Sequence, residues 1–583
     1  MRFLRYAGLA TPLATSLLAL AACSGAEADG TGKTNSATHS AGAGGSGASG
    51  GTASSAGMTG TGGAPSAGGN DAAAGNATAA TSNGGSVGSA MQMGGMAGSS
   101  AGAGAGGSLM TGGAGMAAAG MAGASMAGAS GSSGGGAPLG SLTVSNLKIE
   151  ANPKMSLSAY VSWTSSEAAS SEVQFGTDGY TLHVVDTKQA TDHKVHVVGM
   201  HPETSYKIKA VSTSAAATGS AEGTFTTGKL PTNAPAKGTL VANEVEKMQP
   251  GWTLTNYFVG SGNQPGIMLI LDEEAIPVWY YVHGTGGDQF GMTSTVFLPN
   301  GNVLVGNAAP EPAEEVTLEG EIVWSGPTGG SPSATHHTSK LANGHYIIVR
   351  ESNTSARMEE LDATNKVVWQ WDLYDFLEPK TTAADWCHLN SVSEDAEKGI
   401  LYFNCRFQGL FGVNHSTGDL LWQMGAAIDD SSSGDIKYLP DNSVRFNDSH
   451  DPEVHADGTV LFYDNEGWSS HTGGEGNGTY HTKVVEYQLD QAKKEATLTW
   501  EFPGKFAVDA WYKNDWATPI WGDANRLPNG NVLITAGVKS STAKTRIFEV
   551  TREGEVVWGF EWPSANNGSY RANRISPPPA TKL

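Results

Sequence analysis

The chain has 583 residues, of which 56 are acidic and 34 are basic, giving a formal charge of −22 at pH 7. A surface of this sign repels phosphate groups, which excludes nucleic acid and an anionic membrane surface as partners. The length is sufficient for several domains, but the first quarter of the chain lacks the apolar side chains that a hydrophobic core requires.

Residues 1–22 have the pattern of a secretory signal peptide, with two arginines before an apolar run that ends at Leu20. The run is too short for a transmembrane helix. Residues 20–23 (Leu-Ala-Ala-Cys) are similar to a bacterial lipobox, which implies cleavage before Cys23 and a lipid on its thiol. Ser24 resembles an outer-membrane sorting signal. We therefore expect an exported protein, anchored to the periplasmic or surface face of the outer membrane by its lipid alone; without the lipid it would be periplasmic or extracellular.

Residues 23–138 are almost entirely Gly, Ala, Ser, Thr, Asn and Met. Such a segment cannot bury enough apolar surface to offset the entropy lost on ordering. We expect a disordered linker with an average reach of roughly 60 Å.

Residues 139–228 contain short runs of alternating polar and apolar residues, which predict a small β-sandwich. The segment resembles a fibronectin type III module, most clearly at residues 200–206, where a tyrosine precedes a strand. The resemblance implies that Tyr206 forms a corner hydrogen bond and that Trp163 is the core tryptophan.

The remainder, residues 239–580, contains an internal repeat. An apolar strand that ends in tryptophan occurs six times, at Trp279, Trp324, Trp369, Trp422, Trp500 and Trp558. A turn containing Asn-Gly or Asp-Gly, flanked by apolar residues, recurs out of phase with these strands. The pattern predicts an all-β fold, a six-bladed β-propeller. Because residues 573–575 (Asn-Arg-Ile) are similar to residues 525–527, we expect the C-terminus to supply the innermost strand of the first blade.

Aligning the innermost strands by their turns brings chemically active residues to one level. The position eight residues before the turn glycine is occupied by Thr293, His336, His450 and Gly522, and the alignment of the other two strands adds His388 and Tyr570. Innermost strands line the central channel, so these side chains should surround one of its mouths. Packing alone does not require three histidines in register, and we interpret them as a site.

The three histidines could bind zinc or copper. However, no carboxylate aligns with them, and Arg406 should lie at the same end of its hairpin as His388. A fixed cation repels a metal ion but suits an oxyanion. Because imidazole can attack an electrophile and carry the transferred group, we predict group transfer from a sulfuryl or phosphoryl ester, with His450 as the nucleophile.

The same hairpin register places Cys387 opposite Cys405. In an exported protein this predicts a cross-strand disulfide that holds His388 close to Arg406; two buried thiols are the alternative. The tryptophans between residues 511 and 521 could form the wall of an aryl pocket or could pack within the propeller, and this segment contains Trp511, Trp516 and Trp521.

Several separated motifs of the region 239–580 resemble the bacterial arylsulfate sulfotransferase family. They are residues 385–392 (Asp-Trp-Cys-His-Leu-Asn-Ser-Val), Arg406, residues 417–425, residues 449–453, His336-His337 followed by residues 341–344, and residues 570–572. The resemblance implies a six-bladed propeller that moves a sulfuryl group from a phenolic sulfate ester to a phenol. It implies neither a nucleotide sulfate donor nor a metal, so we expect no cofactor and no metal site.

Carried over by motif, His450 is implied to become sulfated, with His388 and Arg406 binding the anion and assisting the leaving group. Either His336 or His337 completes this catalytic set. Substrate-binding roles are expected for Asn390, Tyr570 and Thr293.

The sequence departs from the family pattern at Asn404-Cys405, where two serines are usual before the arginine, and at Ser449 and Thr338. Two other functions therefore stay open. One is a surface propeller that binds phenolic or anionic ligands without turnover, and the other is an aryl ester hydrolase that uses the same histidines with water. The expected partners are a small aryl sulfate and a phenol; the oligomeric state stays open, with a homodimer as one option.

Overall fold

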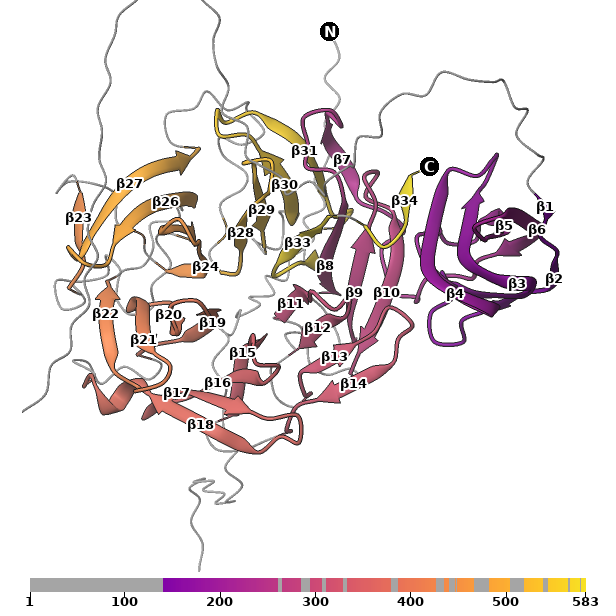
Figure 1. Ribbon diagram of the computed structural model, residues 1–583. Coiled ribbons are helices and arrows are strands. Elements are labelled where there is room, and N and C mark those ends of the chain that lie inside the picture. The colour runs from indigo at the N-terminus through magenta and orange to yellow at the C-terminus, as the bar shows by residue number, and fades with distance from the viewer. Residues whose placement is uncertain are drawn as a thin grey trace, which may run out of the picture. The chain divides into compact units, whose positions relative to one another are not determined.

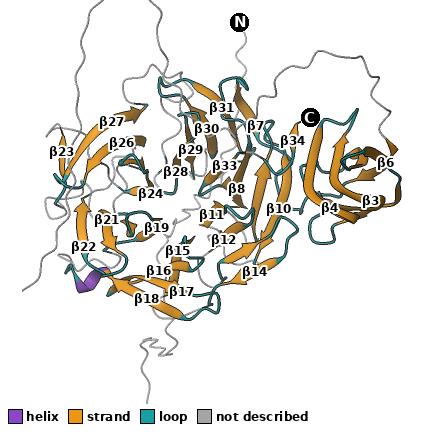
Figure 2. Ribbon diagram, viewed as in Figure 1, coloured by secondary structure: helices purple, strands orange, loops and turns teal. Residues whose placement is uncertain are grey.

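In the part of the chain that the structure describes, the regular secondary structure is β-strand apart from one short 3-10 helix, η1 (Leu373–Asp375) (Figure 2). The computed structural model describes residues 140–259, 265–284, 294–306, 311–328, 333–378, 386–425, 435–439, 446, 448–465, 482–503, 518, 520–537, 544–564, 567–576 and 578–582. The predicted signal peptide, linker and lipidated Cys23 lie outside these residues, as do Thr293, Trp511 and Trp516. No helix in the described part of the chain is long and apolar enough to cross a membrane.

The first domain is a single sheet of seven strands in the order β1-β6-β5-β3-β4-β34, with β2 paired to β3. Its strands are β1 (Gly140–Ser141), β2 (Val144–Ala151), β3 (Ala159–Gly176), β4 (Leu182–Val197), β5 (Ser205–Thr213), β6 (Ala217–Thr226) and β34 (Thr581–Lys582). The first half of β3 pairs with β2 and its second half pairs with β5. The sheet thereby closes over an apolar core that contains Trp163 and Phe175.

Two expectations for this domain are confirmed. Trp163 is buried, and its indole donates a hydrogen bond to Ser212 Oγ (2.8 Å). The backbone N–H of His201 donates to Tyr206 Oη (2.8 Å), which is the expected corner hydrogen bond.

Six further sheets of four or five strands surround a central axis and form the propeller (Figure 1). The first blade contains β8 (Trp252–Val259), β9 (Gly266–Leu271), β10 (Pro277–His283), β32 (Asn567–Gly568) and β33 (Ala572–Ile575). The second contains β11 (Ser294–Phe297), β12 (Val303–Gly306), β13 (Glu314–Val316) and β14 (Ile322–Ser325). The third contains β15 (Ser333–Lys340), β16 (Tyr346–Ser352), β17 (Ser355–Leu361) and β18 (Val367–Asp372). The fourth contains β19 (Leu389–Asp395), β20 (Ile400–Cys405), β21 (Gly409–Asn414) and β22 (Leu420–Met424). The fifth contains β23 (Lys437–Leu439), β24 (Ser449–Val454), β25 (Thr459–Asp464), β26 (Lys483–Asp490) and β27 (Glu495–Phe502). The sixth contains β28 (Asp523–Arg526), β29 (Val532–Ala536), β30 (Arg546–Val550), β31 (Val556–Glu561) and β7 (Thr239–Asn243).

Both ends of the propeller region close the ring. Strand β33 pairs with β8 as the innermost strand of the first blade, which confirms the prediction from the Asn-Arg-Ile similarity. Strand β7 pairs with β31 on the outside of the sixth blade. Closure at two strands covers sheet edges that would otherwise present unpaired backbone groups.

Tryptophans on the outer strands connect four of the blades to the next blade. Indole N–H groups donate to carbonyls of the following blade in four places: Trp279 to Leu318, Trp371 to Gly418, Trp500 to Arg552 and Trp558 to Glu273, at 2.8–2.9 Å. In the third blade Trp369 occupies the register position of the repeat, opposite Glu360, but the hydrogen bond to the next blade is donated by Trp371. The two residues lie on the same face of β18, because side chains alternate along a strand.

A buried glutamate opposite the tryptophan makes a second link between blades. Glu315, Glu360, Glu486 and Glu549 pair in register with Trp324, Trp369, Trp500 and Trp558. Each carboxylate contacts a basic side chain of the following blade, namely Lys340, His415, Arg552 and Arg574 respectively. Three of them also accept hydrogen bonds from the turn of their own blade, as Glu315 does from Asn300 and Asn302. The turn asparagines of the repeat therefore have a structural role.

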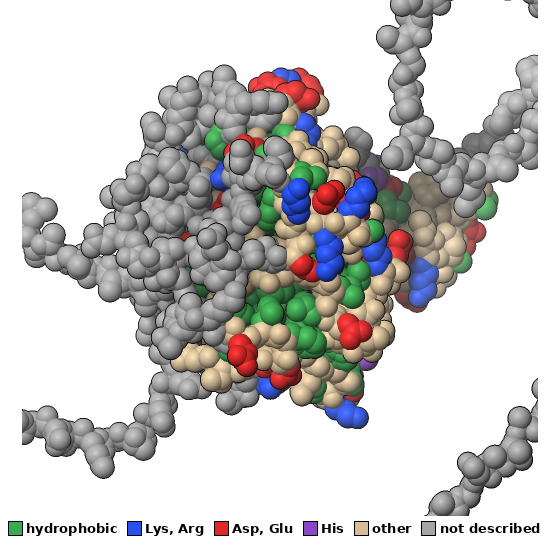
Figure 3. Space-filling model, turned by 90° about the vertical axis from the view of Figure 1, so that its left-hand side faces the viewer, with side chains coloured by type: hydrophobic (Ala, Val, Ile, Leu, Met, Phe, Trp, Pro, Cys, Tyr) green, Lys and Arg blue, Asp and Glu red, His purple; other side chains and the backbone are tan. Residues whose placement is uncertain are grey.

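On the face of the molecule in Figure 3, acidic and basic side chains lie interspersed among uncharged ones. Exposed pairs such as Lys493–Asp490 (2.7 Å) contribute little to stability, because water screens them. The inter-blade glutamates are buried, and their interactions are less screened.

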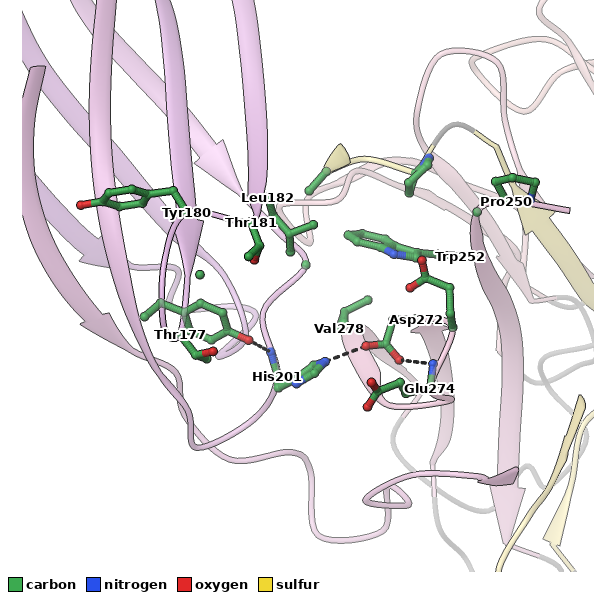
Figure 4. Close-up of a pocket in the computed structure, with 17 residues that line it drawn as sticks. Thr177, Tyr180, Thr181, Leu182, His201, Pro250, Trp252, Asp272, Glu274 and Val278 are labelled. Atoms are coloured by element: carbon green, nitrogen blue, oxygen red, sulfur yellow. Dashed lines mark hydrogen bonds and ion pairs between the residues drawn. The ribbon is translucent and has the colours of Figure 1, made fainter. Parts of the chain in front are cut away.

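The first domain contacts the first propeller blade through a hydrogen-bonded ion pair between His201 Nε2 and Asp272 Oδ2 (2.6 Å). The pair borders a cavity of about 820 Å³ whose lining includes Trp252, Tyr180 and Glu274 (Figure 4). Asp272 is held in place by the backbone N–H groups of Glu274 and Ile276. None of the histidines expected at the channel lines this cavity.

The contact between the first domain and the propeller should be sensitive to pH. The hydrogen bond to Asp272 raises the pKa of His201 above its ordinary value of 6.5. The stabilisation is therefore fully present below about pH 6.5 and is lost as the pH rises through the folded-state pKa. We expect His201→Gln to lower the thermal unfolding midpoint more at pH 6 than at pH 9. An equal loss at both values would contradict this, and His183→Gln, which removes a contact to Glu172 within the first domain, is the control.

Candidate active site

Three neighbouring innermost strands supply the histidines. His336 and His337 lie on β15, His388 directly precedes β19, and His450 lies on β24. All are at most 7% exposed. The rings of His336 and His388 are 4.7 Å apart, and both histidines, with Arg406, act electrostatically on His450. The structure thus brings together residues from three blades at the position where the turn register places them.

Each of the three strands is irregular at this level. The pairing of β15 shifts between Thr335 and Thr338, that of β19 between Leu389 and Ser391, and that of β24 between His450 and Glu453. The left-handed φ values of His336 (31°) and Asp451 (40°) occur within these shifts, and that of His388 (54°) occurs directly before the shift in β19. Bulges redirect side chains, and non-glycine residues in this conformation are concentrated at functional sites. The backbone here is shaped for the side chains it presents.

The hydrogen bonds of Asn465 determine which nitrogen of His450 carries the proton. The Asn465 Nδ2 group donates to the carbonyl oxygens of Thr518 (2.9 Å) and Trp521 (2.8 Å). Its Oδ1 atom therefore faces His450 Nδ1, at 2.5 Å, and can only accept. Nδ1 consequently carries the hydrogen, and the lone pair of the neutral ring is on Nε2.

Burial and the charge of Arg406, together with the neighbouring His388 and His336, hold the pKa of His450 well below its ordinary value. The ring is therefore neutral near pH 7, as a nucleophile must be. No group of three or more His, Cys, Asp and Glu side chains suited to a metal ion occurs within the described ranges.

Arg406 is positioned by the hairpin that carries His388. Its backbone N–H donates to the carbonyl of His388 (3.0 Å), and the next N–H, that of Phe407, donates to the carbonyl of Cys387 (3.3 Å). Its guanidinium carbon lies 5.1 Å from the centre of the Phe407 ring, and its Nε atom is 3.9 Å from a carboxylate oxygen of the buried Asp448. A buried guanidinium beside a neutral imidazole forms a binding site for an anion.

The structure contains the predicted disulfide between Cys387 and Cys405, at the end of the same hairpin. Both half-cystines are fully buried, and they are 18 residues apart in the chain.

We expect the double variant Cys387→Ala/Cys405→Ala to be less stable by about 3 kcal/mol, because a closed loop of this length restricts the unfolded chain. Turnover should fall as well, because the bridge fixes the spacing of His388 and Arg406. Denaturant unfolding without reductant measures the first effect; unchanged stability and turnover together would show that the bridge has neither role.

Asn390 belongs to a buried network that holds the backbone next to the nucleophile. Its Nδ2 group donates to the carbonyl of Ser449 (2.8 Å), and its Oδ1 accepts from Asn404 Nδ2 (2.9 Å). Asn404 also donates to the Ser449 carbonyl (3.0 Å) and accepts from Ser449 Oγ (3.2 Å). The residues that depart from the family pattern at positions 404 and 449 therefore hydrogen-bond to each other.

The two adjacent histidines of β15 have different surroundings. The ring of His336 lies against His388. His337 Nδ1 accepts the backbone N–H of Val392 (2.9 Å), and burial and the charge of Arg571 hold the pKa of His337 well below its ordinary value. This geometry gives His336 the position closer to the other site histidines and gives His337 a link between β15 and β19.

Arg571 is a central residue that the alignment of the innermost strands did not select, although it lies within residues 570–572, one of the motifs that resemble the family. It is 2% exposed, its Nη2 donates to the carbonyl of Asn390 (3.1 Å), and its Nε is 3.2 Å from Asp451 Oδ2. It thus connects β33 to the strands that carry His388 and His450. Near Asp451, burial and the Asp451 charge raise the pKa of Asp523 well above its ordinary value.

An aromatic group lies beside the nucleophile. The ring of Tyr570 is 5.9 Å from that of His450 and 6.0 Å from that of Trp521, which packs edge-on against Phe258. Tyr570, Trp521 and Phe258 form one buried cluster with Ile520. Of the tryptophans proposed for an aryl pocket, Trp521 is the one that the structure describes, and it is part of this packing.

No curated protein matches the chain in sequence. Similar solved structures include a protein of unknown function from Bacteroides caccae (13% identity, 54% of this chain and 94% of that chain, TM-score 0.36). They also include BamB from Moraxella catarrhalis (10% identity, 63% of this chain and 93% of that chain, TM-score 0.27). A third is a catalytically inactive virginiamycin B lyase from Staphylococcus aureus (11% identity, 56% of this chain and 88% of that chain, TM-score 0.30).

The arylsulfotransferase (ASST) family model matches residues 238–571, which is more than half of the chain. The matched region begins just before β7 and includes every site residue described above. The chain belongs to the arylsulfotransferase (ASST) family.

Proposed function

We propose that the protein is an aryl sulfotransferase that moves a sulfuryl group from a phenolic sulfate ester to a phenol through a covalent intermediate on His450. Family membership supports sulfotransferase activity in general. The observation that carries the finer proposal is the hydrogen bond from His450 Nδ1 to Asn465, which leaves the lone pair on Nε2 beside a buried arginine.

In the first half-reaction, the Nε2 lone pair attacks sulfur, and the bond from sulfur to the aryl oxygen breaks with its electron pair on that oxygen. Arg406 balances the charge on the sulfuryl oxygens, as a fixed cation does for a charge that develops in the transition state. His388 or His336 protonates the departing phenolate. In the second half-reaction, the acceptor oxygen attacks sulfur, and the nitrogen–sulfur bond breaks with its pair returning to Nε2.

The aromatic cluster around Tyr570 suits a planar aryl group, because aromatic surfaces bury a large area at a low entropic cost. We also propose, from the lipobox-like residues 20–23, that the enzyme is exported and anchored by a lipid on Cys23.

Initial rates measured with a generic aryl sulfate and a phenol, each varied in turn, test this proposal. A ping-pong transferase gives parallel double-reciprocal lines, and the phenol released equals the new ester formed. Phenol release with water as the sole acceptor would identify a hydrolase. No release from several aryl sulfates would identify a binding protein.

A further inference from the structure

The partner of His450 Nδ1 is a neutral amide, where many catalytic histidines have a carboxylate. A carboxylate stabilises the positive charge that an imidazole acquires during reaction. An amide oxygen accepts a hydrogen bond but has no negative charge with which to hold or remove the proton. The group that holds the Nδ1 proton of the ring in place is therefore neutral.

Asn465 cannot exchange its oxygen and its nitrogen without a loss of hydrogen bonds. Both the amide and its partners are buried, with Asn465 fully so and Thr518 at 1% exposure. Rotation of the amide would place Oδ1 against the carbonyls of Thr518 and Trp521, which also only accept. Thr482 further fixes the position of Asn465. Its hydroxyl accepts a hydrogen bond from the backbone N–H of Thr518 (2.9 Å) and lies 3.3 Å from the backbone carbonyl oxygen of Asn465.

We propose that Asn465 is a positioning residue that keeps the Nδ1 proton on His450 throughout the reaction, so that the intermediate is a zwitterionic N-sulfoimidazolium with a cationic ring. This inference rests on the proposed sulfotransferase function. When Nε2 binds sulfur, a ring that retains its Nδ1 hydrogen has a substituent on each nitrogen and carries one positive charge. The attached sulfonate carries one negative charge, so the sulfated residue is neutral overall.

The consequence concerns the second half-reaction. When the acceptor oxygen binds sulfur, the nitrogen–sulfur bond breaks and its electron pair returns to Nε2, which releases a neutral imidazole. If Nδ1 had lost its proton, the same step would have to release an imidazolate anion, which is a much poorer leaving group. The proton of the acceptor phenol goes to the group that protonated the first phenolate, so the full cycle has no net proton change.

The surroundings of the ring favour rapid transfer from this intermediate. Burial and the Arg406 charge disfavour a positive charge on His450, as the direction of its pKa shift indicates. The ring therefore loses an unfavourable charge when it releases the sulfuryl group. The sulfonate oxygens, in turn, are the atoms that Arg406 can pair with.

Separate measurement of the two half-reactions by rapid quenching tests the proposal. In Asn465→Asp, a carboxylate can take or share the Nδ1 proton and stabilise the sulfated ring. We expect the sulfated enzyme to form but to transfer its group to a phenol at least about tenfold more slowly than wild type. The matched variant Asn465→Ala removes the acceptor without adding charge, so formation of the intermediate should slow at least about tenfold while its transfer is not selectively slowed.

An equal slowing of both half-reactions in Asn465→Asp would overturn the proposal, since a purely structural role predicts that result. If neither variant folds, imidazole ¹⁵N NMR of wild-type protein labelled at histidine decides. A resting His450 with hydrogen on Nδ1 supports the proposal, and hydrogen on Nε2 contradicts it. Absence of any sulfated intermediate in wild type would instead refute the proposed function itself.

Discussion

The variant His450→Asn is expected to turn over aryl sulfates at least about 1,000-fold more slowly than wild type, with little change in stability. The asparagine amide can occupy the place of the Nδ1 group and donate to Asn465 Oδ1. It has no atom at the position of Nε2, so the attack on sulfur is lost. Initial rates with a generic aryl sulfate and a phenol measure the effect, and thermal unfolding measures the stability.

His455→Gln is the matched control for this variant. His455 follows β24, close to Glu453 (3.4 Å) and in the turn that contains Gly458. Burial and the charge of Arg526 lower the pKa of His455 to about 4, so it is a neutral histidine of the same hairpin. Its replacement should leave turnover within about twofold of wild type. If His450→Asn kept substantial turnover, or if the two variants lost similar amounts, His450 would not be the nucleophile.

Glu549→Ala should lower the free energy of unfolding by about 3–5 kcal/mol, because it leaves a buried arginine without its carboxylate. Both side chains of the Glu549–Arg574 pair are at most 1% exposed, with Oε2 and Nη2 3.0 Å apart. Burial already lowers the pKa of Arg574 to about 10, which shows the cost of its position. The carboxylate also accepts from Asn531 Nδ2 (2.6 Å) and the backbone N–H of Gln249 (2.7 Å).

This pair joins the sixth blade to the strand that closes the ring, so its loss should weaken the closure. Denaturant unfolding measures the effect as a lower midpoint. The exposed pair Lys493–Asp490 provides the control, and Lys493→Ala should leave the midpoint unchanged because water screens that contact. A small effect of Glu549→Ala would show that the blades are held together without these buried pairs.

The propeller was predictable because its repeat consists of strand and turn patterns that are each only a few residues long. The six tryptophans and the turns with glycine mark strands and hairpins directly. Gly301 and Gly344 have φ values of 83° and 87°, a conformation that glycine adopts without strain. The closing strand β33 could be assigned because its sequence repeats that of β28. That Trp371 and not Trp369 donates the hydrogen bond to the next blade could not be predicted, because both are tryptophans on one face of the same strand.

The site was only partly predictable. The turn register found His336 and His450, because residues at equal distances from equivalent turns reach the same level of the channel, and alignment of the neighbouring strand added His388. It could not distinguish the surroundings of His336 and His337, because a bulge in β15 decides where each ring points. The disulfide followed from the hairpin register, since Cys387 and Cys405 lie on facing strands.

Asn465 and Arg571 had no pattern of their own. The role of Asn465 depends on the carbonyls of Thr518 and Trp521, which are more than 50 residues away in the chain. Arg571 acts across the channel axis on Asn390 and Asp451, which belong to other blades. Contacts of this kind depend on the closed ring, and a single sequence does not reveal them.

Mass spectrometry of the peptide that contains His450, after brief exposure of the protein to a phenyl sulfate ester, tests whether His450 is the nucleophile. The sample must stay neutral or alkaline, because a sulfated histidine nitrogen is labile in acid. We expect a sulfuryl adduct on His450 that disappears when a phenol is added and is absent from His450→Asn. Turnover without an adduct on His450, or an adduct on a different residue, would contradict it.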